Sequence, residues 1–181
     1  MIIGICGFKG SGKSEVAKML IQDYSFEPLN FKSALINEVT EMFPDTLEEM
    51  SALLDMSVEQ LFSVKPPLMR RFLQNYGTDV RRAEDQDYWV NRWEDSALSN
   101  PGKNFVADDV RFQNEFDKIQ SMGGAVIRVV RDDISTGGEH VSETEHLNFA
   151  QDFTVSASVG ALDHIKTQVD SIMETIKSNT D

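Results

Sequence analysis

The stretch Gly7-Phe8-Lys9-Gly10-Ser11-Gly12-Lys13-Ser14 has the form G-x-x-x-x-G-K-S, which is typical of a phosphate-binding loop. The apolar run 2–6 before it predicts a buried parallel strand, and the apolar spacing from Lys13 to about Asp23 predicts a helix after it. In that context the backbone N–H groups of the loop and the positive end of the helix would hold phosphate oxygens. We therefore expect Lys13 to reach the β- and γ-phosphates of a nucleotide, and the Ser14 hydroxyl to bind Mg²⁺.

The composition is that of an ordinary globular protein, with 40% hydrophobic and 26% charged residues in 181 positions, and predicts a single domain. The single cysteine, Cys6, rules out an intramolecular disulfide and favours a reducing compartment. No basic leader and no apolar run of membrane-spanning length is present, so we expect a cytoplasmic protein with no membrane partner.

The charges point to a small anionic ligand. A net charge of −13 argues against binding to long nucleic acids, which requires a broad basic surface. Every arginine nevertheless lies between positions 70 and 131. Because a guanidinium group matches the geometry of a phosphate, this clustering indicates a local anion site rather than only surface ion pairs.

Apolar periodicity and turn residues divide the rest of the chain into further elements. The expected strands are 26–31, 104–109, 125–131 and 152–156. The expected helices are 33–42, 47–62, 68–76, 88–98, 114–122 and 162–177, with Gly77 ending the third or opening a turn. Strands alternating with helices predict an α/β fold, a three-layer α/β/α arrangement around a mainly parallel five-stranded sheet.

This order of elements leaves a long helical insertion, residues 32–103, between the second and third strands. A second substrate would be held there against a nucleotide bound by the rest of the single domain, residues 1–31 and 104–181. The loop 132–142 is rich in turn formers, which suits a short lid.

A pair of carboxylates, Asp108 and Asp109, ends the predicted strand 104–109. At that point of the sheet a carboxylate can orient Mg²⁺, and the sequence leaves open which of the two does so. Arg111 follows closely and could reach the same phosphates. Arg128 and Arg131 precede the lid loop, and either could close on the transferred phosphoryl group.

The insertion carries two arginine pairs, Arg70-Arg71 and Arg81-Arg82, and one member of each could hold a second phosphate. Trp89 could stack on a base or could belong to the core. His140 and His146 are not needed as bases, because an acceptor phosphate with a pKa near 6 is already largely ionised at neutral pH.

The chain resembles the deoxynucleoside monophosphate kinases of tailed bacteriophages. The residues that carry the resemblance are the phosphate loop, Arg70-Arg71-Phe72-Leu73-Gln74 with Gly77-Thr78-Asp79, Tyr88-Trp89-Val90, Asp109-Val110-Arg111 with Glu115, Val129-Val130-Arg131, and His140-Val141-Ser142-Glu143. They extend over the chain to about Val169. One departure is Ser14, where some relatives carry Asp; the other is an insertion that looks shorter than in the largest relatives.

The resemblance implies transfer of the ATP γ-phosphoryl group to a deoxynucleoside monophosphate, with ATP and Mg²⁺ as cofactors. It also implies a kinase core of residues 1–31 and 104–181, a monophosphate-binding insertion 32–103 and a lid 132–142, in the host cytoplasm if a phage encodes the chain. The implied ATP-binding residues are Gly10, Ser11, Gly12, Lys13, Ser14 and Glu15, and the implied metal ligands are Ser14 with Asp108 or Asp109. The implied monophosphate-binding residues are Lys9, Arg70, Arg71, Gly77, Thr78, Arg82, Trp89, Asp109, Arg111 and Glu115. The implied catalytic residues are Lys13, Arg111, Arg131 and Asp109.

The sequence leaves other functions open. Another small-molecule kinase, acting on dephospho-coenzyme A or on a nucleoside, would have less use for the paired arginines and would want a carboxylate base, which Asp109 could supply. A nucleotide switch is disfavoured because no Asn-Lys-x-Asp segment is present. The complete loop disfavours a structural subunit. The bases accepted, the strictness for deoxyribose and the oligomeric state, monomer or homodimer, are left undecided.

Overall fold

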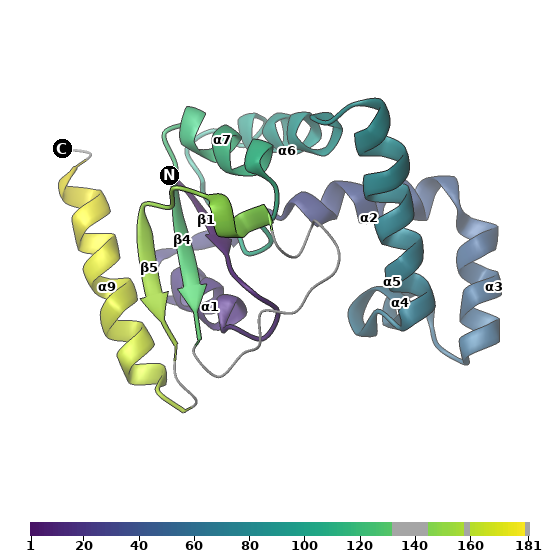
Figure 1. Cartoon of the computed structure of the whole chain (residues 1–181), viewed down its shortest axis with the longest axis horizontal. Helices are drawn as coiled ribbons and strands as arrows, with labels where there is room; N and C mark the ends of the chain where they lie inside the picture. The colour runs from purple at the N-terminus through teal and green to yellow at the C-terminus, as the bar shows by residue number, and fades with distance from the viewer. Residues whose placement is uncertain (132–144, 158–159, 180–181) are drawn as a thin grey trace. The chain divides into compact units, whose positions relative to one another are not determined.

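The computed structural model describes residues 1–131, 145–157 and 160–179 of the chain (Figure 1). The chain divides into two compact units. One, here called the sheet unit, consists of Met1–Asn30 with Ser96–Asp181, and the other, the helical unit, consists of Phe31–Asp95. Each unit is described by itself.

The sheet unit is built on one five-stranded sheet. Its strands are β1 (Ile2–Cys6), β2 (Phe26–Pro28), β3 (Asn104–Ala107), β4 (Ala125–Val130) and β5 (Phe153–Ser156). They lie in the order β2-β3-β1-β4-β5, and every neighbouring pair is parallel. A parallel sheet with helical crossovers is what the alternating pattern predicts, and the α/β fold class is confirmed.

Side chains alternate between the two faces of the sheet along the central strand β1. Ile3 and Ile5 are fully buried in a cluster with α1 (Lys13–Tyr24) and α9 (Leu162–Ser178). Gly4 faces the other side, where a Cβ would lie 2.6 Å from Cδ1 of Ile119 in α7 (Gln113–Ser121). The period of two residues in a strand thus produces helix layers on both faces, and α7 needs glycine beneath it to pack this closely.

The helical unit has its own apolar core. Its elements are α2 (Phe31–Met42), α3 (Pro44–Leu54), α4 (Val58–Val64), α5 (Pro67–Gln74), a π-helix η1 (Asn75–Arg82) and most of α6 (Tyr88–Leu98). The core consists of Val39, Leu47, Leu61, Met69, Leu73, Tyr76 and Trp89. Each helix contributes one or two of these residues, so the unit depends on contacts between helices that are distant in sequence.

Three local expectations are wrong. The expected strand 26–31 stops at Pro28, and Phe31 begins α2. The expected helix 47–62 is two helices, because the Ser57 hydroxyl accepts from the N–H of Gln60 and starts α4. Gly77 neither ends a helix nor opens a turn but lies inside η1. The predicted lid, 132–142, lies outside the described residues.

Candidate active site

The phosphate loop connects β1 to α1 through backbone conformations that favour glycine. Gly7 has φ +135° and Gly12 has φ +104°. A Cβ on Gly7 would lie 2.4 Å from the carbonyl oxygen of Val129, well inside contact distance. The loop closes with a hydrogen bond from the N–H of Ser11 to the carbonyl of Phe8, 3.1 Å. The glycines of the motif are therefore required by the geometry of the turn.

Lys13 begins α1 and folds back over the loop. Its Nζ donates to the carbonyl oxygens of Gly7, at 2.8 Å, and Phe8, at 2.7 Å. The first turn of α1 follows directly, so the ammonium group and the helix N-terminus both contribute positive charge near the loop. This is the arrangement that an anionic phosphate chain requires.

The two carboxylates that follow β3 have different environments. Asp108 Oδ2 accepts a hydrogen bond from the Ser14 hydroxyl at 3.3 Å, and its N–H donates to Asn30 Oδ1 at 2.9 Å. Asp109 is 7% exposed and is part of the packed turn after the strand. Asp108 is thus the carboxylate beside Ser14, and sequence reasoning did not identify Asn30, which holds it there.

Arg111 and Glu115 are connected through the backbone. Glu115 is 3% exposed, and its Oε2 accepts from the N–H groups of Arg111, at 2.7 Å, and Phe112, at 3.1 Å. The carboxylate therefore holds the turn that carries Arg111 at the start of α7. A direct contact of Glu115 with a monophosphate stays a prediction.

The two arginines around the end of β4 are used differently. Arg131 Nη1 donates to the carbonyl of Gly10 at 3.1 Å, so this guanidinium lies against the phosphate loop. Arg128 Nη2 donates to the carbonyls of His146, at 2.6 Å, and Phe149, at 3.1 Å. Arg128 thereby ties the short helix η2 (Glu145–Asn148) to the sheet, and Arg131 is the arginine placed at the loop.

His146 lies beside the phosphate loop, which the sequence did not indicate. The imidazole is 2% exposed, and its ring meets the ring of Phe8 edge-on at 4.9 Å. Burial and the nearby charges of Arg128, Lys13 and Arg111 lower the pKa of His146 to about 4. The ring is therefore neutral at neutral pH. The charges of Lys13 and Arg111 both contribute to this lowering, after the larger effect of burial.

The remaining predicted residues belong to the helical unit. Arg70 and Arg71 lie in α5, and within the described part of the chain neither guanidinium has a hydrogen bond or an ion pair. Gly77, Thr78 and Arg82 lie in η1, where Arg82 Nη1 donates to the carbonyl of Gln86 at 3.3 Å.

Trp89 is 3% exposed, and its indole N–H donates to the carbonyl of Gly77 at 2.8 Å. Its contacts are those of a core residue, which was one of the two readings of the sequence. Stacking of Trp89 on a base stays a prediction that these contacts do not support.

The sequence of the chain is similar to those of known kinases. A sequence model of the deoxynucleotide monophosphate kinase family matches residues 48–169. A protein of Acanthamoeba polyphaga mimivirus named "Putative deoxynucleotide monophosphate kinase" is 31% identical over 164 residues, which cover 80% of this chain and 81% of that protein. The chain belongs to the deoxynucleotide monophosphate kinase family. The matched segment contains both arginine pairs of the insertion as well as Arg111 and Arg131.

A solved structure supports the fold of this kinase family member independently. Shikimate kinase from Aquifex aeolicus is similar with a TM-score of 0.50 and 14% identity, covering 99% of this chain and 98% of that one. At this identity the likeness concerns the fold alone. Among the helices that the structure describes, none combines the length and apolar character needed to cross a bilayer.

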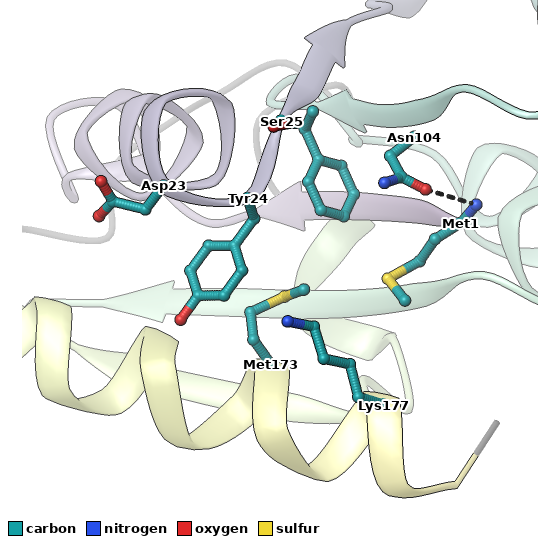
Figure 2. Close-up of a pocket in the computed structure, with 8 residues that line it drawn as sticks. Met1, Asp23, Tyr24, Ser25, Asn104, Met173 and Lys177 are labelled. Atoms are coloured by element: carbon teal, nitrogen blue, oxygen red, sulfur yellow. Dashed lines mark hydrogen bonds between the residues drawn. The ribbon is translucent and has the colours of Figure 1, made fainter. Parts of the chain in front are cut away.

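A cavity of about 250 Å³ lies at the other end of the sheet (Figure 2). Met1, Phe26 and Asn104, at the starts of β1, β2 and β3, line it together with Tyr24 and Lys177. Because the strands are parallel, their first residues lie together at one end of the strands. The phosphate loop follows the last residue of β1 and therefore lies at the opposite end. This cavity is therefore not the phosphate site of the kinase.

Proposed function

We propose that the protein transfers the γ-phosphoryl group of ATP to a deoxynucleoside 5′-monophosphate, giving the diphosphate and ADP. The observation that carries the proposal is a complete phosphate loop with Lys13 folded over it and Arg131 against it, in a chain of the deoxynucleotide monophosphate kinase family. In the reaction an oxygen of the acceptor phosphate forms a bond to the γ-phosphorus. The bond from that phosphorus to the bridging oxygen breaks, and ADP leaves with the electron pair.

The chain's own residues would act by charge and position. Lys13, Arg111 and Arg131 would neutralise the charge that spreads over the transferred group and the leaving oxygen. Asp109 would position the acceptor or the metal. No general base is needed, because the second pKa of a phosphate monoester is about 6. The neutral ring of His146, with its lowered pKa, adds no charge of its own beside these cations.

Mg²⁺ fits the donors at the loop. The Ser14 hydroxyl and the Asp108 carboxylate are hard oxygen ligands whose oxygen atoms are 3.3 Å apart. Mg²⁺ usually takes one or two such protein ligands and completes its shell with water and phosphate oxygens. When bound, the ion would neutralise charge on the β- and γ-phosphates.

In the helical unit we assign the monophosphate to residues of α5 and η1. In the sheet unit, Lys9, Arg111 and Glu115 stay predicted monophosphate contacts. Arg70 and Arg71 are the cations best suited to the monophosphate, because in the described residues their side chains form no ion pair, whereas Arg81 and Arg92 are committed to Glu38. Gly77, Thr78 and Arg82 would complete this set.

A coupled ADP-release assay with Mg²⁺-ATP and each common dNMP and NMP in turn tests the function. We expect turnover with at least one dNMP that exceeds the rate without acceptor by about 10³-fold or more, and weaker turnover with the matching ribonucleotide. ADP release only with dephospho-coenzyme A or a nucleoside, or with no acceptor at all, would overturn the assignment.

Replacing Arg70 or Arg71 by glutamine tests the monophosphate side. Loss of a charged contact to phosphate predicts that KM for the dNMP rises by about 10-fold or more, while KM for ATP changes by less than about twofold. Arg92→Gln is the matched control in the same unit, since this exposed arginine already pairs with Glu38 at 3.5 Å. An equal rise in both KM values would remove Arg70 and Arg71 from the monophosphate side.

A further inference from the structure

Glu38 in α2 joins two other elements of the helical unit through its two carboxylate oxygens. Oε1 accepts from the Tyr76 hydroxyl at 2.6 Å and from Arg81 Nε at 2.8 Å, both in η1. Oε2 accepts from the Tyr88 hydroxyl at 2.7 Å and lies 3.5 Å from Arg92 Nη2, both in α6. One oxygen therefore serves the π-helix and the other serves α6.

The spacing of the two η1 residues matches a π-helix. Tyr76 and Arg81 are five residues apart, and Arg81 Nε also donates to the Tyr76 hydroxyl at 3.0 Å. A π-helix forms hydrogen bonds between residues five apart, which brings such residues to one face. In an α-helix the same two residues would be turned by about 140° from each other about the axis. A single carboxylate oxygen that binds both side chains thus favours the π form of Asn75–Arg82 over the α form.

The carboxylate is an ionised group in a mostly buried position. Its side chain is 9% exposed. Burial by itself raises the pKa of Glu38, but hydrogen bonds from Tyr76, Tyr88 and Arg81 outweigh it and bring the pKa below its usual value. The Arg81 guanidinium lies 5.3 Å from the centre of the Tyr76 ring and 5.0 Å from that of Tyr88. The cluster is therefore charged, paired and tightly packed at neutral pH.

The π-helix matters because it carries residues of the monophosphate side. Gly77, Thr78 and Arg82 lie in it, and it continues directly from α5 with Arg70 and Arg71. Changing the hydrogen-bond spacing from five residues to four turns every later residue to a new angle about the axis. Relaxation of η1 to an α-helix would therefore change how Thr78 and Arg82 are oriented relative to the α5 arginines.

We propose that Glu38 is a positioning residue that holds Asn75–Arg82 in the π form, and that this form sets the affinity for the monophosphate. The second half of the statement rests on the proposed function. Glu38 acts through Tyr76 and Arg81 and does not contact the substrate.

The test compares Glu38→Gln, Tyr76→Phe and Arg92→Gln in the full chain. Backbone NMR without substrate gives the helical spacing of residues 75–82, and steady-state kinetics give KM for the dNMP and for ATP. We expect Glu38→Gln to lose the five-residue spacing and to raise KM for the dNMP about 10-fold or more, with KM for ATP within about twofold. Tyr76→Phe keeps the ring and removes only the hydroxyl on Oε1, so a rise of about threefold is expected.

Arg92→Gln is the control inside the same cluster. It removes a cation from Oε2 and from the Tyr88 hydroxyl, while both hydrogen bonds from η1 to Oε1 remain, so the spacing and both KM values should stay unchanged. If Arg92→Gln raises KM for the dNMP as much as Glu38→Gln does, the effect is general loosening and the proposal is overturned. Unchanged spacing and KM in both Glu38→Gln and Tyr76→Phe also overturn it.

Two further outcomes are decisive. If Glu38→Gln does not fold, Tyr76→Phe decides by the same two readouts. If the unmodified protein phosphorylates no dNMP, the proposed function fails. The NMR spacing then still judges the role of Glu38: loss of the π form in Glu38→Gln supports it, and retention overturns it.

Discussion

The sheet unit and the helical unit prepare their cations for phosphate in different ways. In the sheet unit the backbone does the work: glycines with positive φ shape the loop, and Lys13 lies on two carbonyl oxygens of that same loop. In the helical unit side chains take this role, since the carboxylate of Glu38 binds Tyr76 and Arg81 in η1, the element that carries Arg82. The first arrangement is contained in eight consecutive residues, whereas Glu38 contacts residues 38 to 54 positions away.

Substitutions in the two units should therefore have different effects on activity and on stability. A local, backbone-defined site should lose activity without losing the fold when a charged side chain is removed, and lose the fold when its backbone is altered. A site held by long-range side-chain contacts should show substrate-specific effects when the contacts are weakened. A substitution and a control at a comparable position should therefore differ in activity, in stability or in both.

The largest effect is expected from Lys13→Ala. Removal of the loop ammonium should lower kcat by about 10³-fold, because it takes away charge stabilisation in the transition state. The melting temperature should change little, since the Lys13 hydrogen bonds to the carbonyls of Gly7 and Phe8 lie within one short loop and join no distant parts of the core. Lys18→Ala is the matched control on the same helix: its side chain is 61% exposed, and its ammonium pairs with Glu15. A near-normal kcat of Lys13→Ala would show that the loop lysine is not required for catalysis.

Gly7→Ala should cost stability rather than only activity. The new Cβ would lie 2.4 Å from the Val129 carbonyl oxygen, and φ at this position is +135°. We expect a loss of about 3 kcal/mol or more in the free energy of unfolding, measured by urea denaturation. Gly102→Ala has a similar conformational cost at φ +85° but nothing within 4 Å, so about 1 kcal/mol is expected. Equal losses in the two variants would mean that the overlap with Val129 is relieved by a small shift of β4.

Arg131 and Arg128 should separate catalysis from stability. Arg131→Gln should lower kcat by about 10- to 100-fold with an unchanged melting temperature, because its guanidinium lies against the loop at Gly10. Arg128→Gln should lower the melting temperature, because it loses bonds to the carbonyls of His146 and Phe149. The kcat and the melting temperature of both variants are measured. If Arg128→Gln lowers kcat and Arg131→Gln lowers the melting temperature, the roles of the two arginines are exchanged.

Much of the fold could be predicted because its signals are local. The strand–loop–helix at residues 2–23 follows from an apolar run, a glycine pattern and helical periodicity, and it matches β1 and α1. The break between α3 and α4 was missed because it depends on one capping hydroxyl, Ser57, within an otherwise periodic stretch.

Other features of the site could not be predicted, because their causes are distant in sequence. The π-helix Asn75–Arg82 continues past the predicted end of the helix 68–76, and its Tyr76 and Arg81 side chains bind Glu38, which is far away in the sequence. The place of His146 beside Phe8 depends on how η2 meets the loop, 138 positions earlier, and the position of Asp108 depends on the amide of Asn30. Residue types indicated the ligand class, whereas the contacts that orient them required the structure.

The smallest effect concerns His146 and pH. Because the pKa of His146 falls from its ordinary value near 6.5 to about 4 on folding, the unfolded chain binds more protons between these pH values. The stability linked to His146 is therefore fully present above pH 6.5 and is lost as the pH falls toward 4. His146→Phe removes the titration while keeping an aromatic ring against Phe8. It should reduce the loss of stability over this interval by on the order of 2 kcal/mol.

Urea denaturation at several pH values between 4 and 7.5 measures this difference, and carboxylates that titrate below pH 5 affect both proteins alike. His164→Phe is the matched control, since His164 is exposed on α9, and its pH profile should follow that of the unmodified protein. If His146→Phe keeps the full pH dependence, the imidazole is already solvated in the folded state.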